Sequence, residues 1–148
     1  MIKDYELQHG VVLVQLISSM IEPIFFEKFN PKSNASYVIN NKIGIYIKYC
    51  AKRLTPWRFT FLRAHQEEIE NLKNNYNDVF IILVCHKDGI VALDWNSLKT
   101  ILDNEHKEVE WIAVSRGKNK MYSITGSDGI LNFKVSKSDF PQKIIEKV

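Results

Sequence analysis

Several residue types that define small-protein classes are scarce in this chain. Its 148 residues include two cysteines, six glycines and four prolines. Cys50 and Cys85 are too few and too far apart for a disulfide framework, and each lies in an apolar run. We therefore expect two buried, reduced thiols in a cytoplasmic protein. No stretch has the composition of a linker, so residues 1–148 should form a single domain.

Long hydrophobic runs are missing as well. The apolar stretch at residues 11–17 is too short to cross a bilayer, and the first six residues are too acidic for a signal peptide. A strong excess of one charge is also missing, because the formal net charge is only +3. These absences argue against a membrane protein and against a dedicated nucleic-acid-binding tail.

The residues that are present suffice for one hydrophobic core, since 45% of them are hydrophobic. Apolar residues at helical spacing predict a helix over 5–20. The apolar stripe of this helix consists of Leu7, Val11, Val14, Ile17 and Ile21, and Leu13 and Leu16 widen it. The rest of the first half is predicted to hold strands and one more helix. The strands are expected at 36–40, 43–50, 57–61 and 79–85, and the helix at 63–76.

The second half indicates hairpins and shorter helices. Asp88-Gly89 is a tight-turn pair, so residues 90–93 should fold back on the preceding strand. Asp94 is a suitable N-cap for a helix over 95–102. The remaining predicted elements are strands at 110–115, 121–125 and 130–135 and a helix from residue 140. We expect an α/β fold with a mixed central sheet flanked by helices.

A lysine in the middle of the apolar strand 43–50 is unexpected, because lysine is rarely buried without a partner. Lys48 either reaches an open cleft or extends its amine to the sheet edge. Basic and aromatic residues follow it closely, and cations with aromatic rings can bind phosphates and stack on bases. This predicted nucleic-acid surface consists of Lys48, Lys52, Arg53, Trp57, Arg58 and Arg63.

Other interpretations of these aromatic and basic residues remain open. Trp57, Phe59 and Phe61 alternate with polar residues, so they can equally form the core face of a strand. A second basic group lies in the loop 116–120 and is, by default, a solvated hairpin tip. If this loop lies beside Lys52 and Arg53, an anionic partner is favoured.

The order helix, three strands, helix, strand resembles the αβββαβ core of the PD-(D/E)XK nucleases, which include Holliday-junction resolvases and restriction-type enzymes. The resemblance covers residues 5–85, and residues 86–148 form an extension. In Ile45-Tyr46-Ile47-Lys48, Lys48 matches the lysine of that motif. Gln66 matches the glutamine of the following helix, and Glu6 the acidic residue of the first. The resemblance therefore implies Lys48, Gln66 and Glu6 as the catalytic candidates.

The acidic residues of the motif are absent from the expected positions. Tyr46 stands where the family has a carboxylate, and no acid lies between residues 30 and 61. Family members use paired carboxylates to hold Mg²⁺, and tyrosine cannot replace one at neutral pH. The resemblance then implies a non-catalytic domain without metal or cofactor that binds nucleic acid or a protein partner.

Two other functions stay open. A divergent Mg²⁺-dependent phosphodiesterase would recruit acids from elsewhere, and the candidates are Glu6, Glu22, Asp88 and Asp94. A structural subunit of a larger complex, or a homo-oligomer, would use the charges as ordinary surface. His65 fits a capping or packing role better than that of a catalytic base.

Overall fold

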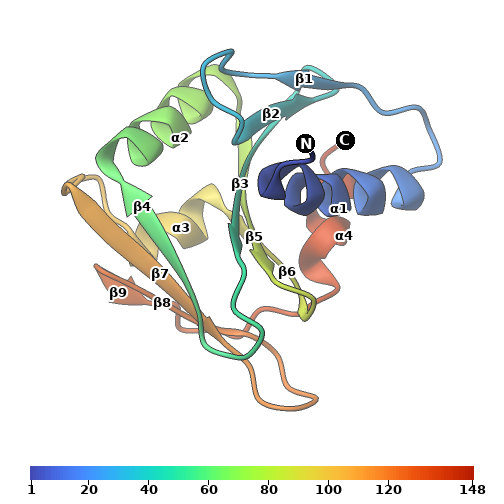
Figure 1. Ribbon diagram of the computed structural model, residues 1–148. Coiled ribbons are helices and arrows are strands. Elements are labelled where there is room, and N and C mark those ends of the chain that lie inside the picture. The colour runs from blue at the N-terminus through green and yellow to red at the C-terminus, as the bar shows by residue number, and fades with distance from the viewer.

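A computed structural model describes residues 1–148 and shows two β-sheets packed face to face (Figure 1). Sheet A has five strands in the order β1-β2-β3-β5-β6. Strands β3 and β5 are parallel, and the other neighbouring pairs are antiparallel. The strands are β1 (Phe26–Lys28), β2 (Ser36–Ile39), β3 (Ile43–Cys50), β5 (Asp78–Cys85) and β6 (Gly89–Asp94).

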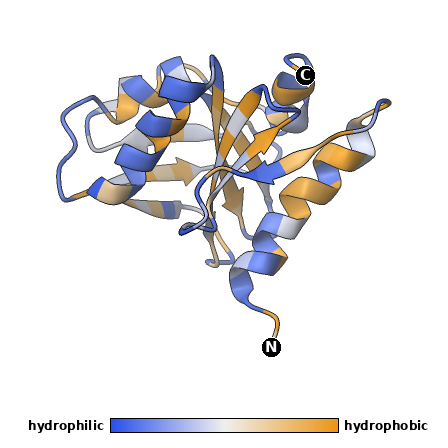
Figure 2. Ribbon diagram, turned by 90° about the horizontal axis from the view of Figure 1, so that it is seen from above, coloured by the Kyte–Doolittle hydropathy of each residue, from blue (hydrophilic) through white to orange (hydrophobic).

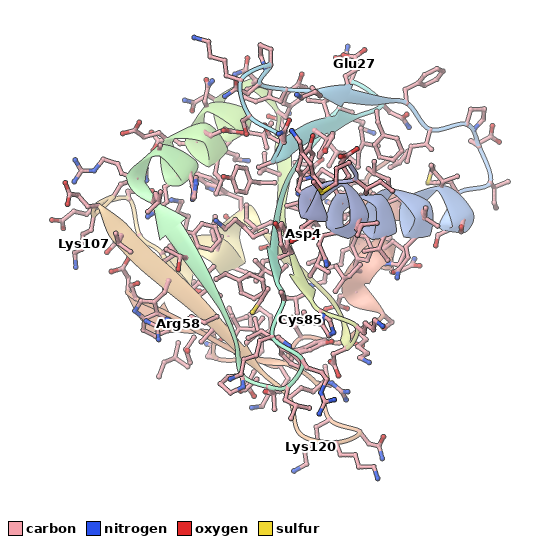
Figure 3. The ribbon with its side chains drawn as sticks, viewed as in Figure 1. Asp4, Glu27, Arg58, Cys85, Lys107 and Lys120 are labelled. Atoms are coloured by element: carbon pink, nitrogen blue, oxygen red, sulfur yellow. The ribbon has the colours of Figure 1, made fainter.

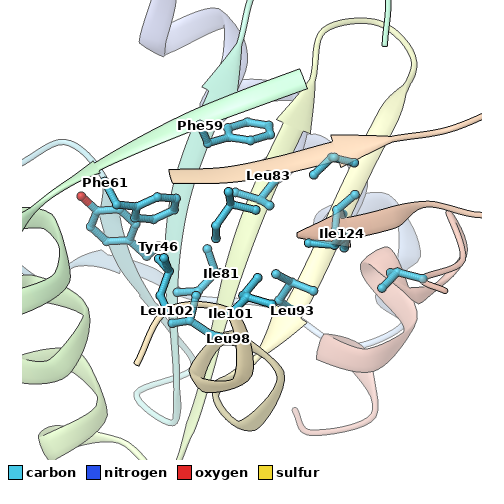
Figure 4. Close-up of a cluster of buried hydrophobic side chains, with 14 of the residues drawn as sticks. Tyr46, Phe59, Phe61, Ile81, Leu83, Leu93, Leu98, Ile101, Leu102 and Ile124 are labelled. Atoms are coloured by element: carbon cyan, nitrogen blue, oxygen red, sulfur yellow. The ribbon is translucent and has the colours of Figure 1, made fainter. Parts of the chain in front are cut away.

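Sheet B is a smaller antiparallel sheet in the order β4-β7-β8-β9. Its strands are β4 (Trp57–Leu62), β7 (Val109–Ser115), β8 (Ser123–Gly126) and β9 (Gly129–Ile130). The inner face of sheet B packs on sheet A and forms one core with it (Figure 4). The outer face is not covered by a helix (Figure 1).

Four helices complete the domain. They are α1 (Asp4–Ser19), α2 (Arg63–Asn75), α3 (Trp95–Ile101) and α4 (Asp139–Ile145). Helices α1 and α4 cover the face of sheet A that points away from sheet B, whereas α2 and α3 lie on the opposite side of sheet A, toward sheet B (Figure 1). None of the four is both long and apolar enough to traverse a bilayer.

The α/β class and the first-half elements expected from the sequence are confirmed. Strands β2 and β3 pair as the expected antiparallel hairpin. Asn40 and Asn41 make its turn with positive φ angles of 51° and 55°, which asparagine adopts at low cost. In the second half, β6 folds back on β5 as predicted, and the Asp94 carboxylate caps α3 by accepting from the Ser97 N–H at 2.8 Å.

The arrangement differs from the expected single sheet at β4. This strand follows β3 in the chain but pairs with β7 in sheet B, over the register Trp57↔Val114 to Leu62↔Val109. Alternation explains the choice: Trp57, Phe59 and Phe61 are buried, so β4 presents one apolar face to the core and one polar face to water. A strand inside sheet A needs both faces apolar, as β5 has.

Two local predictions were wrong. The five main residues of the predicted stripe of α1 are exposed; of the two that widen it, Leu16 is buried against sheet A together with His9 and Val12. Apolar residues occur around most of this helix, so helical spacing alone did not identify the packed side. The strand predicted at 130–135 is mostly irregular: only Gly129–Ile130 pairs with β8, and Val135 makes a single bridge to Tyr122.

Candidate functional site

The exposed edge of β3 is the starting point of the candidate site. Strand β2 pairs only with residues 43–46 of β3, while β5 pairs with β3 along its whole length. Beyond the hydrogen bond from the Ile47 N–H to the Ala35 carbonyl, at 2.9 Å, this edge has no strand beside it. Lys48 lies here, half-buried, with Nζ 5.2 Å from the centre of the Phe61 ring.

A cavity of about 490 Å³ opens beside Lys48. Its walls come from the first turns of α1, the segment before β2, the end of β3 and the first turn of α2. The lining residues are Tyr5, His9, Asn34, Ala35, Tyr46, Ile47, Lys48, Tyr49 and His65. Lys48 is the one residue among them with a charged aliphatic side chain, and none is a carboxylate. Of the two alternatives for Lys48, the structure shows both an open cleft beside it and its position at the edge of β3.

Desolvation lowers the pKa of all three basic groups that line this cavity, His9, Lys48 and His65. Desolvation lowers the pKa of Lys48 to about 8. The pKa of His65 is lowered first by desolvation and then by the positive charge of Lys48. His65 Nδ1 accepts from the Leu62 N–H at 3.1 Å and lies 3.2 Å from Lys48 Nζ. Nδ1 is therefore unprotonated and caps α2, which is the capping role the sequence favoured.

The catalytic candidates Lys48, Gln66 and Glu6 are not brought together. Gln66 is buried and donates from Nε2 to Glu110 Oε1 at 3.1 Å, in the contact between α2 and β7. Glu6 is exposed and accepts from the Lys3 N–H at 3.0 Å. Neither side chain lines the cavity. The chain contains no group of three or more histidine, cysteine, aspartate or glutamate residues placed to hold a metal ion.

Carboxylates that a divergent metal site would recruit have other partners or lie elsewhere. Asp88 forms a bidentate ion pair with Arg116, at 2.7 and 2.9 Å, and Asp94 caps α3. Glu22 is exposed in the connector after α1. Asp4 and Glu6 flank the lining residue Tyr5 in the chain, and neither lines the cavity. Glu68, three residues after His65, accepts from Ser36 at 2.5 Å. No paired carboxylates therefore face Lys48.

The predicted basic-aromatic surface divides into three parts along β4. Lys52 and Arg53 are exposed in the loop before the strand, and Arg58 is on its outer face. Arg63 follows the strand and donates from Nε to the His106 carbonyl at 3.1 Å. Lys48 is on the other side of β4, because it contacts Phe61 on the inner face. The sequence alone does not give the orientation of β4, so it could not show that these residues lie on different sides of that strand.

Trp57 cannot contribute to a binding surface. Its side chain is 2% exposed in the core, and Nε1 donates to the Lys52 carbonyl at 2.9 Å. The aromatic residue on the outer face of sheet B is Trp111. The centre of its ring lies 4.5 Å from the Arg58 guanidinium carbon. Trp111 was missed, although the alternation of β7 indicates its direction because Ile112 and Val114 point inward.

The loop 116–120 does lie beside the loop that carries Lys52 and Arg53. The Arg116 N–H donates to Thr55 Oγ1 at 3.1 Å, which joins the two loops. A hollow of about 690 Å³ opens here, lined among others by Thr55, Lys120 and Lys134. Lys120 lies at the lower tip of the molecule, with Arg58 above it on the strand (Figure 3). The condition that favours an anionic partner is met.

Comparison with known proteins gives no match. No protein-family model matches the chain, and neither a curated protein nor a solved structure matches it.

Proposed function

We propose that this protein binds single-stranded nucleic acid along the outer face of sheet B. The observation that carries the proposal is the meeting of the two basic loops at one end of an uncovered sheet face that bears Arg58 and Trp111. Lys52, Arg53 and Lys120 supply cations at that end, and Arg58 supplies one above Trp111. Arg116 contributes less, because Asp88 already neutralises it.

Each part has a physical role in this mode of binding. Lysine and arginine side chains neutralise backbone phosphates, and the released counterions make the affinity dependent on salt. An aromatic ring on an open sheet stacks on an unpaired base, whatever the base is. Trp111 is half-buried, and the Arg58 guanidinium carbon lies 4.5 Å from the centre of its ring, so a base that stacks on Trp111 would meet Arg58 as well. The free thiols of Cys50 and Cys85 suit a cytoplasmic protein.

Fluorescence anisotropy with labelled single- and double-stranded oligonucleotides at 50 and 200 mM salt tests the proposal. If four cations each neutralise one phosphate, single-strand affinity falls about 50-fold over this range. Trp111→Leu should weaken binding about 5- to 150-fold through lost stacking. Lys120→Ala should weaken it and flatten the salt dependence. Lys42→Ala is the matched control, since Lys42 is exposed in the β2–β3 turn at the far end of sheet A.

Absent or salt-independent binding would refute the proposal, as would equal affinity for the wild type and Trp111→Leu. The same samples with Mg²⁺ or Mn²⁺, resolved on a gel, show whether the oligonucleotide is cleaved. Metal-dependent cleavage that is lost in Lys48→Ala would instead support the phosphodiesterase alternative.

A second candidate function, subunit of a homo-oligomer, is favoured by the exposed side of α1. Its apolar residues recur every three or four positions, the spacing of helices that pair along a common seam. These residues are Leu7, Val11, Val14 and Ile17, and Ile21 follows just after the end of the helix; each is at least 37% exposed. The helix beside the N-terminus accordingly shows long hydrophobic stretches (Figure 2). Apolar patches of this kind mark interaction sites.

We propose a second copy of the chain as the partner of this helix side, because a two-fold axis lets one apolar seam cover its own copy. Sedimentation velocity at increasing protein concentration should show a dimer for the wild type. Val14→Glu should be monomeric, and Gln15→Glu, the exposed neighbouring position, should remain dimeric. A wild type that stays monomeric at all concentrations rules this assembly out.

A further inference from the structure

Lys48 has no counter-ion within its cavity. A half-buried ammonium is normally paired, because removing it from water costs free energy that a nearby carboxylate offsets. No ion pair involves Lys48, and the lining residues include no acid. The groups packed around its amine are His65 from α2 and Phe61 from β4. Glu68, one turn beyond His65, is held by Ser36.

The other polar groups of the cavity favour negative charge as well. Two helices begin at its rim: Tyr5 is the second residue of α1 and His65 the third residue of α2. The partial positive charge at the start of α2, whose first turn has no acid, attracts anions, whereas Asp4 and Glu6 already lie in the first turn of α1. His65 accepts at Nδ1, so the neutral ring carries its proton on Nε2 and is a donor there. Asn34 adds an amide that can donate.

Aromatic rings form the apolar part of the walls. His9 packs edge-to-face with Tyr5, at 5.4 Å between ring centres, and with Tyr49 at 6.4 Å. Its Nδ1 is 3.0 Å from the Tyr37 hydroxyl, which fixes the ring. Tyr46, 2% exposed, completes the wall next to His65. Flat rings at fixed positions suit a flat, partly apolar ligand.

We propose that this cavity binds a small organic anion, with a carboxylate or phosphate group at Lys48 and a ring between the aromatic walls. The site is independent of the proposed nucleic-acid surface, because β4 lies between Lys48 and Arg58. A bound anion takes the place of the missing counter-ion. Binding therefore requires the charged form of Lys48 and weakens as its amine loses the proton above about pH 8.

Isothermal titration calorimetry with benzoate and with phenyl phosphate tests this site at pH 7. Both ligands carry an anionic group on a ring, and the ligand that binds more tightly shows whether the site prefers a carboxylate or a phosphate. Benzyl alcohol is the neutral control and should bind at least about tenfold more weakly. Lys48→Met, which keeps the apolar stem, should lose at least about tenfold in affinity, and Lys48→Arg should retain most of it.

The matched control is Lys42→Met, exposed in the β2–β3 turn and outside both proposed sites, which should bind as the wild type does. Heteronuclear NMR of the same samples confirms that Lys48→Met is folded and locates the shifts at Tyr49 and His65. In the wild type, the bound anion should raise the Lys48 pKa toward its ordinary value. Equal affinity of Lys48→Met and wild type, or no binding of either anion at millimolar concentration, overturns the proposal.

Discussion

Lys48 shows how a single residue can be costly for the fold and useful for a site. Its amine sits between Phe61 and His65 without a carboxylate, and burial lowers its pKa to about 8. The unfolded chain holds the proton up to the ordinary lysine pKa near 10.5. Between these two values the unfolded state binds more protons than the folded state, so stability due to this residue rises with pH.

Replacing Lys48 with methionine should therefore stabilise the protein at pH 7 and have less effect near pH 10.5. The measurement is the free energy of unfolding in urea of both proteins from pH 7 to 10.5. The difference between them isolates Lys48 from other groups that titrate in this range. A difference that does not change with pH would show that the amine is solvated in the native state.

Gly126 in β8 is required by close contact rather than by a turn. A Cβ there would lie 2.4 Å from the Ile101 carbonyl oxygen and 2.8 Å from its Cβ. Gly126→Ala should lower the free energy of unfolding by about 1–3 kcal/mol, since α3 must shift. Gly10→Ala, in the interior of α1 with no neighbour within 4 Å, should instead add about 0.5–1 kcal/mol. Thermal and urea unfolding compare the two, and equal effects would contradict the packing at Gly126.

At the scale of elements, the β5–β6 turn is fastened to sheet B by one carboxylate. Asp88 accepts from Arg116 Nε and Nη2 and from the Tyr122 hydroxyl, the last at 2.7 Å. The hydrogen bonds from Arg116 are the largest cause of its lowered pKa. The two sheets share a core, but this cluster fixes their relative position at the turn.

Asp88→Ala should destabilise the protein by about 1–3 kcal/mol at pH 7, because it leaves Arg116 and Tyr122 without their acceptor. The loss should shrink as pH falls below the ordinary aspartate pKa near 3.8, because the unfolded chain takes up the proton there and the native carboxylate only at its lower pKa. Urea unfolding at pH 7 and pH 3 measures it. Lys118→Ala, exposed in the same loop as Arg116, serves as the neutral control. A loss that is equal at both pH values would assign the effect to packing.

For the whole molecule, sheet A is the layer that both cores share. Ile81 faces sheet B and Ile82 faces α1 and α4, and both are fully buried on adjacent positions of β5. Strand β5 lies between β3 and β6 and contributes side chains to both cores, so unfolding of one core also removes packing from the other.

Ile81→Ala and Ile82→Ala should each cost about 2–5 kcal/mol and leave a single unfolding transition. Tryptophan fluorescence reports the sheet B side, and far-ultraviolet circular dichroism reports the whole chain. The two transitions should coincide in both variants. Separate transitions in Ile82→Ala would mean that α1 and α4 detach before the sheets unfold.

Local patterns in the sequence determined most of the elements. Helical spacing, turn pairs and the Asp94 cap depend on residues near in the chain, so α1, α2, α3 and the β5–β6 hairpin could be predicted. Lys48 also indicated its cleft, because a cation without a partner in an apolar strand is costly unless its amine reaches an open space. The resemblance to the nuclease core stays a prediction.

Only the tertiary structure decided which surfaces these elements share. The placement of β4 in sheet B puts Lys48 and Arg58 on opposite sides of one strand, although they are only ten positions apart in the chain. It also buries Trp57, leaves Trp111 half-buried on the outer face and joins the two basic loops. The reason is physical: periodicity fixes which side of an element is apolar, whereas pairing between distant strands depends on the total area that the whole chain can bury.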